Sequence, residues 1–223
     1  LSRARNFGIK KAKGNYIIFN DDDSFLSKDY FLKVRDVVKE KKEYTVFSGI
    51  ILTIEEKLPF SRYMKMTERE LNYYDYDTFL SSNLCIERNA LLECEGFDSD
   101  FGVGAKWGGS EDADLFIRLL ILGNKVLYTP DIVVFHPKEN LDLQDICFIK
   151  NKMYSYGLGR GAFYRKFVRK IFFWAMNQFC FSILKSVVGI FVGLIRFNVK
   201  MFYKHFYSFF GRISGFLKYY YVW

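Results

Sequence analysis

Three adjacent carboxylates, those of Asp21, Asp22 and Asp23, form the most chemically suggestive group in the sequence. They directly follow a short apolar run, residues 16–19, that reads as a strand buried on both faces of a sheet. α/β proteins bind ligands beyond the carboxyl ends of their strands. Neighbouring negative charges repel one another, and a divalent cation that also binds phosphate oxygens would compensate them. The alternative is an inert, solvated acidic turn. The group therefore predicts a cation site only in combination with other residues.

A second acidic group opens a predicted helix, within the segment from Trp107 to Asp114. Glu111, Asp112 and Asp114 fall in its first turn, where the helix dipole favours negative charge, and this alone is a complete structural explanation. Asp114 is spaced for an ion pair with Arg118 four residues later, which leaves Asp112 freer. Because glycines precede it and let a substrate approach, Asp112 is a candidate general base for an acceptor hydroxyl.

The third candidate is His136, which follows an apolar run at residues 125–135 and is one of two histidines. A neutral imidazole can complete a metal shell if the strand order brings it beside Asp23. A purely structural histidine is the alternative.

These candidates are carried by alternating helical and strand patterns, which predict an α/β fold. We expect helices over residues 2–12, 29–43, 89–94 and 111–122, and strands over 16–19, 44–52, 81–86 and 125–135. The irregular stretch between Glu55 and Leu80 is expected to be a surface excursion near the site.

Charge divides the chain into two parts. The net charge is +8, yet residues 146–223 contain no Asp or Glu and thirteen Lys and Arg, so residues 1–145 carry about −5 and the tail about +13. We therefore expect a domain over 1–145 and a basic, aromatic-rich helical tail over 146–223. Four irregularly spaced cysteines indicate reduced thiols in a cytoplasmic setting.

Five stretches in order resemble the family-2 inverting glycosyltransferases with a GT-A fold, over roughly residues 1–140. They are Leu1–Ile9 with Ala12–Asp23, Ser82–Arg88, Glu95–Asp98, the Glu111-Asp112 helix start with Arg118, and a late strand ending in His136. The resemblance implies a GT-A-type mixed sheet flanked by helices. Family members normally begin with a βαβ segment that holds the nucleotide base. Because none precedes Leu1, we expect an N-terminally incomplete domain that binds donor poorly.

The resemblance also implies roles for the acidic triplet. Asp21 and Asp23 would bind Mn²⁺ or Mg²⁺ together with the donor diphosphate, with His136 as a further metal ligand. Asp22 would lie near the donor ribose, and Arg5 would contact the donor, for which a UDP-sugar is favoured.

On the acceptor side, the resemblance makes Asp112 the catalytic base, with Glu111 beside it. Trp107, Gly108 and Gly109 resemble the Trp-Gly-Gly loop of galactosyltransferase-like members, which would place Trp107 against an acceptor sugar ring. The implied reaction moves a sugar, with inversion, to a hydroxyl of a lipid-linked or polysaccharide acceptor in cell-envelope glycan synthesis.

The tail contains a 25-residue apolar stretch, residues 171–195, which is long enough to span a membrane. Lys185 near its centre and basic residues on both flanks argue against a span. On a continuous helix Gln178, Lys185, Arg196 and Lys200 share one face, which suits a helix in the interface of an anionic membrane. We expect a peripheral or re-entrant tail at the cytoplasmic face. The alternatives are a helical subdomain packed on the core and an oligomer contact.

The alternative functions are a non-catalytic, basic nucleic-acid-binding module and a degenerate transferase that serves as a scaffold. Long apolar runs in the tail fit nucleic acid poorly, so we expect no nucleic-acid partner. Intact Asp21, Asp23 and Asp112 count against the scaffold.

Overall fold

The computed structural model describes residues 1–138 and 143–219, which pack as two compact units. The sheet unit contains residues 3–98 and 112–138. The helical unit contains residues 1–2, the loop 99–111 and residues 143–219. The loop therefore packs with the C-terminal helices, although it precedes part of the sheet unit in sequence.

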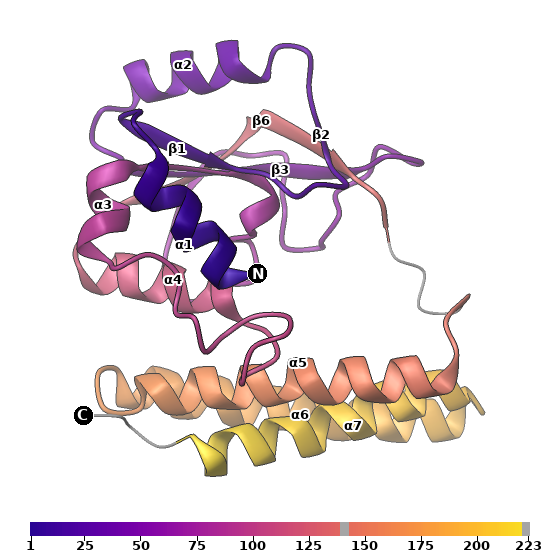
Figure 1. Cartoon of the computed structure of the whole chain (residues 1–223). Coiled ribbons are helices and arrows are strands. Elements are labelled where there is room, and N and C mark those ends of the chain that lie inside the picture. Colours follow the sequence, from indigo (N-terminus) through magenta and orange to yellow (C-terminus); the bar gives the residue numbers. More distant parts are fainter. Residues whose placement is uncertain (139–142, 220–223) are drawn as a thin grey trace. The chain divides into compact units, whose positions relative to one another are not determined.

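The sheet unit is α/β: helices flank one mixed sheet (Figure 1). Its strands are β1 Tyr16–Phe19, β2 Phe25–Leu26, β3 Val46–Thr53, β4 Arg69–Leu71, β5 Leu84–Glu87 and β6 Val126–His136. Its helices are α1 Ser2–Lys11, α2 Tyr30–Glu40, α3 Arg88–Glu93 and α4 Glu111–Ile121, with a 3₁₀ turn, η1, over Ser81–Asn83. The expected mixed sheet with flanking helices is confirmed.

The strand order is β1-β5-β3-β6-β2, with β4 also paired to β6. β3 and β6 are parallel, whereas β5 is antiparallel to both β1 and β3. It follows that β1, β3 and β6 run in one direction. The acidic triplet after β1 and His136 at the end of β6 therefore both lie at the carboxyl ends of these parallel strands. The expectation that β1 is buried on both faces was wrong: it is an edge strand whose first three residues are only partly buried.

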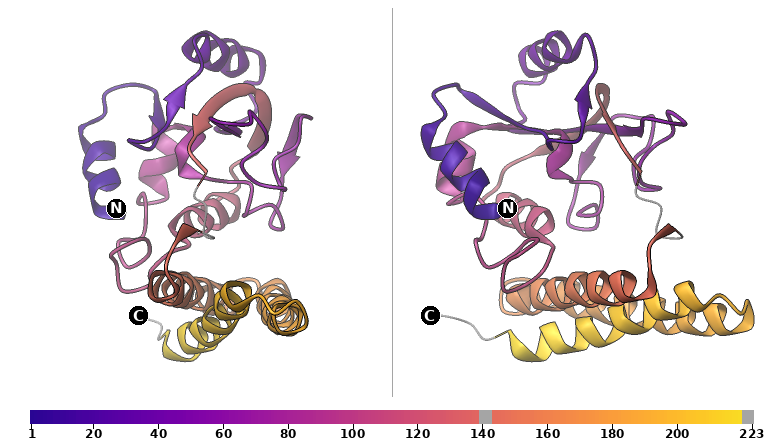
Figure 2. Two further views of the ribbon diagram at one scale, coloured as in Figure 1. Left: turned by 90° about the vertical axis from the view of Figure 1, so that its right-hand side faces the viewer. Right: turned by 45° about the vertical axis from the view of Figure 1, so that its right-hand side comes forward.

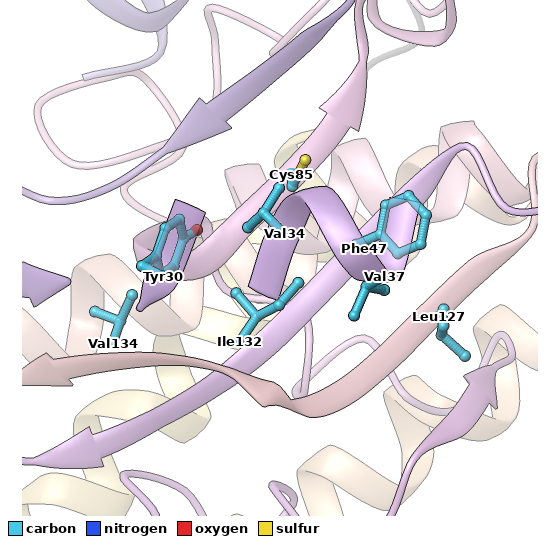
Figure 3. Close-up of a cluster of buried hydrophobic side chains, with 8 residues drawn as sticks. All are labelled: Tyr30, Val34, Val37, Phe47, Cys85, Leu127, Ile132 and Val134. Carbon is cyan, nitrogen blue, oxygen red and sulfur yellow. The ribbon is translucent and has the colours of Figure 1, made fainter. Parts of the chain in front are cut away.

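One face of the sheet is covered by α2, and α3 and α4 lie on the other (Figure 1). Between α2 and the sheet lies a cluster of buried side chains (Figure 3), formed by Tyr30, Val34, Val37, Phe47, Cys85, Leu127, Ile132 and Val134. The helix contributes positions 30, 34 and 37, which share one face at the helical period. Burial of this face fixes α2, and the connection before it, on the sheet.

A buried amide ties the central strands together. Asn83 Nδ2 donates to the carbonyl oxygens of Ile50 (2.8 Å) and Ile132 (2.9 Å), and Asn83 Oδ1 accepts from the Tyr30 hydroxyl (3.0 Å). A Cβ on Gly49 would lie 2.3 Å from Asn83 Nδ2, so only glycine leaves room for this arrangement.

Most predicted elements are confirmed, and the differences are local. Residues 81–86 were expected to be a strand, but the stretch begins as η1 because Asn83 turns inward to bond two strands. β2 and β4 were not predicted, because they are only two and three residues long. The helix over 111–122 is confirmed as α4, which Gly123 ends in the left-handed conformation, φ 84°.

The helical unit contains α5 Ile146–Phe167, α6 Phe172–Ile195 and α7 Val199–Lys218, which run side by side (Figures 1 and 2). The assumed continuous helix through Lys200 was wrong. α6 ends at Ile195, Phe197 has a left-handed backbone (φ 50°), and Lys200 lies on α7. Within the described residues α6 is the helix that is long and apolar enough to cross a membrane.

Candidate active site

Asp21 lies at the start of the turn that follows β1. The turn closes through a hydrogen bond from the Ser24 N–H to the Asp21 carbonyl oxygen (3.2 Å) and a second from the Ser24 hydroxyl to Asn20 Oδ1 (2.7 Å). The Asp21 carboxylate accepts a hydrogen bond at each oxygen: Oδ1 from Arg5 (3.0 Å) and Oδ2 from the Ser82 hydroxyl (2.8 Å). Its orientation is therefore fixed by α1 and by η1.

Arg5 joins the two acidic groups that the sequence left far apart. Its Nη2 pairs with Asp21 Oδ1 at 3.0 Å, and its Nη1 lies 3.5 Å from Asp112 Oδ1. The carboxylate after β1 and the carboxylate opening α4 thus share one guanidinium, although 91 residues separate them in the chain. The structure brings together the residues on which the sequence interpretation depended.

The guanidinium of Arg5 is itself held in place. It lies over the Phe97 ring, 5.2 Å from the centroid. Asn6, the next residue of α1, donates to the Phe97 carbonyl (2.6 Å) and accepts from the Phe97 N–H (2.8 Å). Gly96 makes this turn with φ 67°, where a Cβ would lie 2.6 Å from Asn6 Oδ1. The Glu95–Asp98 motif therefore carries the ring that supports Arg5.

His136 faces the acidic triplet. Its Nε2 lies 3.3 Å from Asp23 Oδ1 and 3.8 Å from Asp21 Oδ2, and one ligand atom from each of the three residues lies within 4.8 Å of the others. The His136 Nδ1 is 2.7 Å from the Pro137 carbonyl oxygen. Since a carbonyl can only accept, Nδ1 carries the proton, and in the neutral ring Nε2 presents a lone pair to the two carboxylates.

Three electron-pair donors that face one another fit a cation. Two carboxylate oxygens and a neutral imidazole nitrogen are ligands that Mn²⁺ accepts, and the oxygens also suit Mg²⁺. Asp23 has a side chain 57% exposed, which leaves that side of the group open to a substrate phosphate. A protonated imidazole would balance the charges equally well in a site without a metal.

Asp112 lies at the first turn of α4 and is largely enclosed. Its Oδ2 accepts from the Ser81 N–H (3.0 Å), while its Oδ1 has Arg5 beside it and accepts no hydrogen bond within the described part of the chain. Desolvation by burial raises the pKa of the Asp112 carboxyl, and the Asp21 charge adds to this, while Arg5 and the Ser81 N–H oppose it. A carboxylate with a raised pKa is a better proton acceptor near neutral pH.

The other predicted site residues have mixed positions. Asp22 is exposed beside the Asp21 and Asp23 pair. Trp107, Gly108, Gly109 and Glu111 belong to the helical unit, where Trp107 is 4% exposed and its ring lies 5.5 Å from that of Tyr219.

The two glycines lie against α5. A Cβ on Gly108 would meet the Ser155 side chain, and Gly159 approaches the Gly109 backbone so closely that its own Cβ would lie 2.5 Å from the Gly109 carbonyl oxygen. In this structure these glycines serve the close packing of loop and helix.

Sequence reasoning missed the roles of Ser81, Ser82 and Phe97. Two signals were present: the polar triplet Ser81-Ser82-Asn83 directly before an apolar strand, and the aromatic residue after Gly96. Only the fold shows which acidic groups they contact.

Comparison with known proteins gives two findings. The model of the family described as glycosyltransferase like family 2 matches residues 1–145, which is more than half of the chain. A relative named glycosyltransferase GlyA, from Streptococcus pneumoniae serotype 4, is 25% identical over 176 residues. The alignment covers 76% of this chain and 23% of that relative, so the chain spans about a quarter of the relative's length.

Proposed function

Since the chain belongs to glycosyltransferase like family 2, we propose that it is a metal-dependent, inverting sugar transferase with a GT-A-type fold. The observation that carries the proposal is the connected set of side chains at the sheet edge. His136 faces Asp21 and Asp23, Asp21 pairs with Arg5, and Arg5 lies beside Asp112. Asp21, Asp23 and His136, at one end of this set, are suited to bind a cation with a diphosphate. Asp112, at the other end, is suited to accept a proton.

In the proposed site, Asp21, Asp23 and His136 would hold Mn²⁺ or Mg²⁺. The cation would supply charge stabilisation for the departing nucleoside diphosphate. His136 contributes Nε2, because its Nδ1 proton is committed to the Pro137 carbonyl. Asp22, which is exposed beside this group, is the proposed contact to the donor ribose, and Arg5 would add a positive charge for the donor phosphates. A UDP-sugar is the proposed donor.

Asp112 is the proposed base, with Glu111 next to it at the helix start. As the acceptor oxygen forms its bond to the anomeric carbon, the bond from that carbon to the diphosphate oxygen breaks, and the hydroxyl proton passes to the Asp112 carboxylate. Attack opposite the leaving group inverts the anomeric configuration. Arg5 keeps the carboxylate ionised and oriented before the proton arrives.

The proposed acceptor is a lipid-linked or polysaccharide hydroxyl at the cytoplasmic face of a membrane. The support is the basic C-terminal part and its candidate membrane helix, α6. Contact of the acceptor with Trp107, beside Gly108 and Gly109, requires the buried indole to become exposed, so movement of the loop is part of the proposal.

The test is sugar transfer from a panel of nucleotide sugars by the purified protein. We expect turnover with Mn²⁺ or Mg²⁺, loss of turnover with a chelator and recovery when the metal is restored. Mass spectrometry of the product gives the sugar transferred, and NMR of the new anomeric proton gives the configuration. Retention of the donor configuration, or full activity in the chelator, would contradict the proposal.

A further inference from the structure

Helix α6 has two faces of opposite character. At about 100° per residue, the side chains that point away from the helical unit form one apolar stripe. Its large, exposed members are Phe173, Phe181, Leu184, Val188, Phe191 and Ile195. Apart from Trp174 near the start of the helix, the buried residues of α6 are small and lie on the opposite face: Ala175, Ser182, Ser186, Gly189 and Gly193. A soluble core helix would bury its large apolar side chains, whereas α6 exposes them.

The small-residue face holds α6 in contact with the α7 backbone. A Cβ on Gly193 would lie 2.7 Å from the Phe202 amide nitrogen, and one on Gly189 would overlap the His205 ring. Arg212 of α7 donates from Nη1 to the Ser182 carbonyl oxygen (3.3 Å) and to the Ser186 hydroxyl. The glycines thus let the backbones of α6 and α7 approach closely, and Arg212 links the two helices by hydrogen bonds.

The same packing joins α7 to α5. A Cβ on Gly157 would lie 2.5 Å from the Ser208 carbonyl oxygen, and one on Gly211 would lie 2.4 Å from the Tyr154 carbonyl oxygen. Close backbone contact through small residues is typical of helices that associate in a lipid environment. The three helices therefore pack closely on one another, and α6 exposes more large apolar side chains than α5 or α7 does.

Basic side chains surround the exposed stripe. Arg169 and Lys170 are exposed just before α6, and Arg196 is exposed just after it. Lys185, near the middle, is exposed at the edge of the stripe, and its Nζ lies 4.4 Å from the centroid of the Phe181 ring. No acidic residue follows Asp145 in the sequence. An apolar stripe with a positive border is complementary to the acyl chains and headgroups of an anionic leaflet.

The charge of α7 decides how deep the three helices can lie. α7 carries Lys200, Lys204, Arg212 and Lys218, and no acidic residue accompanies them. A spanning α7 would place Lys204 and Arg212, which lie away from its ends, in the hydrocarbon core, and the cost of burying these two charges opposes a crossing. Because α6 is packed along α7, α6 cannot cross without breaking the glycine contacts.

We propose that α6 lies in the plane of an anionic leaflet, with the stripe from Phe173 to Ile195 facing the acyl chains and α7 and α5 behind it. This inference deepens the membrane association proposed above and rests on it, but it is independent of the transfer chemistry. It selects one face of one helix as the lipid contact and excludes a spanning helix.

The first experiment measures binding of the full chain to vesicles with and without anionic lipid. Leu184→Asp and Phe191→Asp should each weaken binding to anionic vesicles at least tenfold. Phe31→Asp is the matched control, since Phe31 on α2 is 65% exposed and should leave binding unchanged. Lys185→Glu with Arg196→Glu alters only exposed groups and should remove the preference for anionic lipid. Equal binding by all variants would overturn the proposal, as would retention on single-stranded DNA but not on vesicles.

The second experiment separates an in-plane helix from a spanning one. A fluorophore is placed at residue 173, 184 or 195 by single Cys substitutions in a Cys147→Ser, Cys180→Ser background, and its quenching by depth-specific lipids is compared. An in-plane helix gives the same shallow depth at all three positions. A deep position at 184 with shallow ends would show a spanning helix and contradict the inference. Asp112→Asn should bind vesicles normally, so failure of vesicle binding and failure of sugar transfer can be distinguished.

Discussion

Arg5 is the residue on which the candidate active site is centred. It pairs with Asp21, lies beside Asp112 and is supported from below by the Phe97 ring. Two carboxylates that would otherwise repel each other are held on one side chain, and each is left with an oxygen directed elsewhere. Asp21 Oδ2 faces His136, and Asp112 Oδ2 accepts the Ser81 N–H.

The first prediction concerns pH. Because the pKa of Asp112 is raised, the rate of sugar transfer should fall on acidification at a pH above the usual Asp range, as the base becomes protonated. Arg5 opposes this shift, so Arg5→Gln should move the acidic limb of the pH profile of kcat to still higher pH. The check is kcat against pH for both proteins, with Arg35→Gln on the exposed face of α2 as control. An unchanged limb would exclude coupling between Arg5 and Asp112.

The second prediction concerns the cation. Removing one of three ligands, in His136→Ala or Asp23→Asn, should weaken Mn²⁺ binding by about 10–100-fold, a range typical even of changes around a metal site. Titration of the bound ion by electron paramagnetic resonance measures this directly. Asp36→Asn, on α2, where the half-exposed side chain pairs with Arg35, should have no effect. Equal Mn²⁺ affinity in all four proteins would remove Asp23 and His136 from the metal site.

At the scale of elements, the positions of helices and strands were more predictable than their partners. The apolar spacing predicts both α4 and β6, and Gly123 marks the end of α4. The strand order does not, because pairing of β1 with β5 joins segments about 70 residues apart. Ser82 and Asn83 illustrate this: the sequence shows two polar residues before a strand, and only the fold makes one a partner of Asp21 and the other a buried bridge between strands.

The break between α6 and α7 was hidden for another reason. Phe197 adopts φ 50°, a conformation that usually calls for glycine, so the residue at the break does not itself indicate a turn. The local signal is Asn198, whose side chain accepts from the Met201 N–H at the start of α7. The small residues at the contacts between α5, α6 and α7 can be seen in the sequence. Which helix each of them packs against could not be predicted from their spacing.

Asn83 provides the third prediction. In Asn83→Leu the Ile50 and Ile132 carbonyls and the Tyr30 hydroxyl lose their partner, which should cost about 2–4 kcal/mol of local stability. Tyr30→Phe removes one of these bonds and should cost about 1 kcal/mol. Hydrogen exchange followed by mass spectrometry checks both values through peptides that cover β3, with α5 peptides as an internal reference. Equal protection of β3 in wild type and Asn83→Leu would show that the bridge does not stabilise the sheet.

At the scale of the whole molecule, charge and apolar surface are distributed unevenly. Residues 1–145 carry an excess of acidic groups. Residues 146–223 contain basic side chains and no Asp or Glu. The carboxylates of the proposed chemistry belong to the acidic part, and the proposed lipid contact belongs to the basic part. The two functions can therefore be perturbed separately.

This separation gives the fourth prediction. Raising salt from about 0.1 M to about 1 M shortens the Debye length from about 10 Å to about 3 Å. Affinity for anionic vesicles should fall steeply, because the basic groups around α6 are exposed, while residual binding through the apolar stripe persists. Co-sedimentation across a salt series measures this. Binding that does not respond to salt would exclude an electrostatic contribution from the tail.

The central claim is that the Asp112 carboxylate takes the proton from the hydroxyl of the acceptor sugar. Arg5 links this carboxylate to Asp21 of the proposed metal site. Asp112→Asn tests it most directly, with sugar transfer, Mn²⁺ affinity and thermal unfolding measured on the same protein. Loss of a general base should lower kcat by about 10²–10⁴-fold, while Mn²⁺ binding stays intact. Because folding raises the pKa of Asp112, the buried charge disfavours the folded state above that pKa, so the melting temperature at neutral pH should not fall. Transfer at the wild-type rate by this variant would contradict the account.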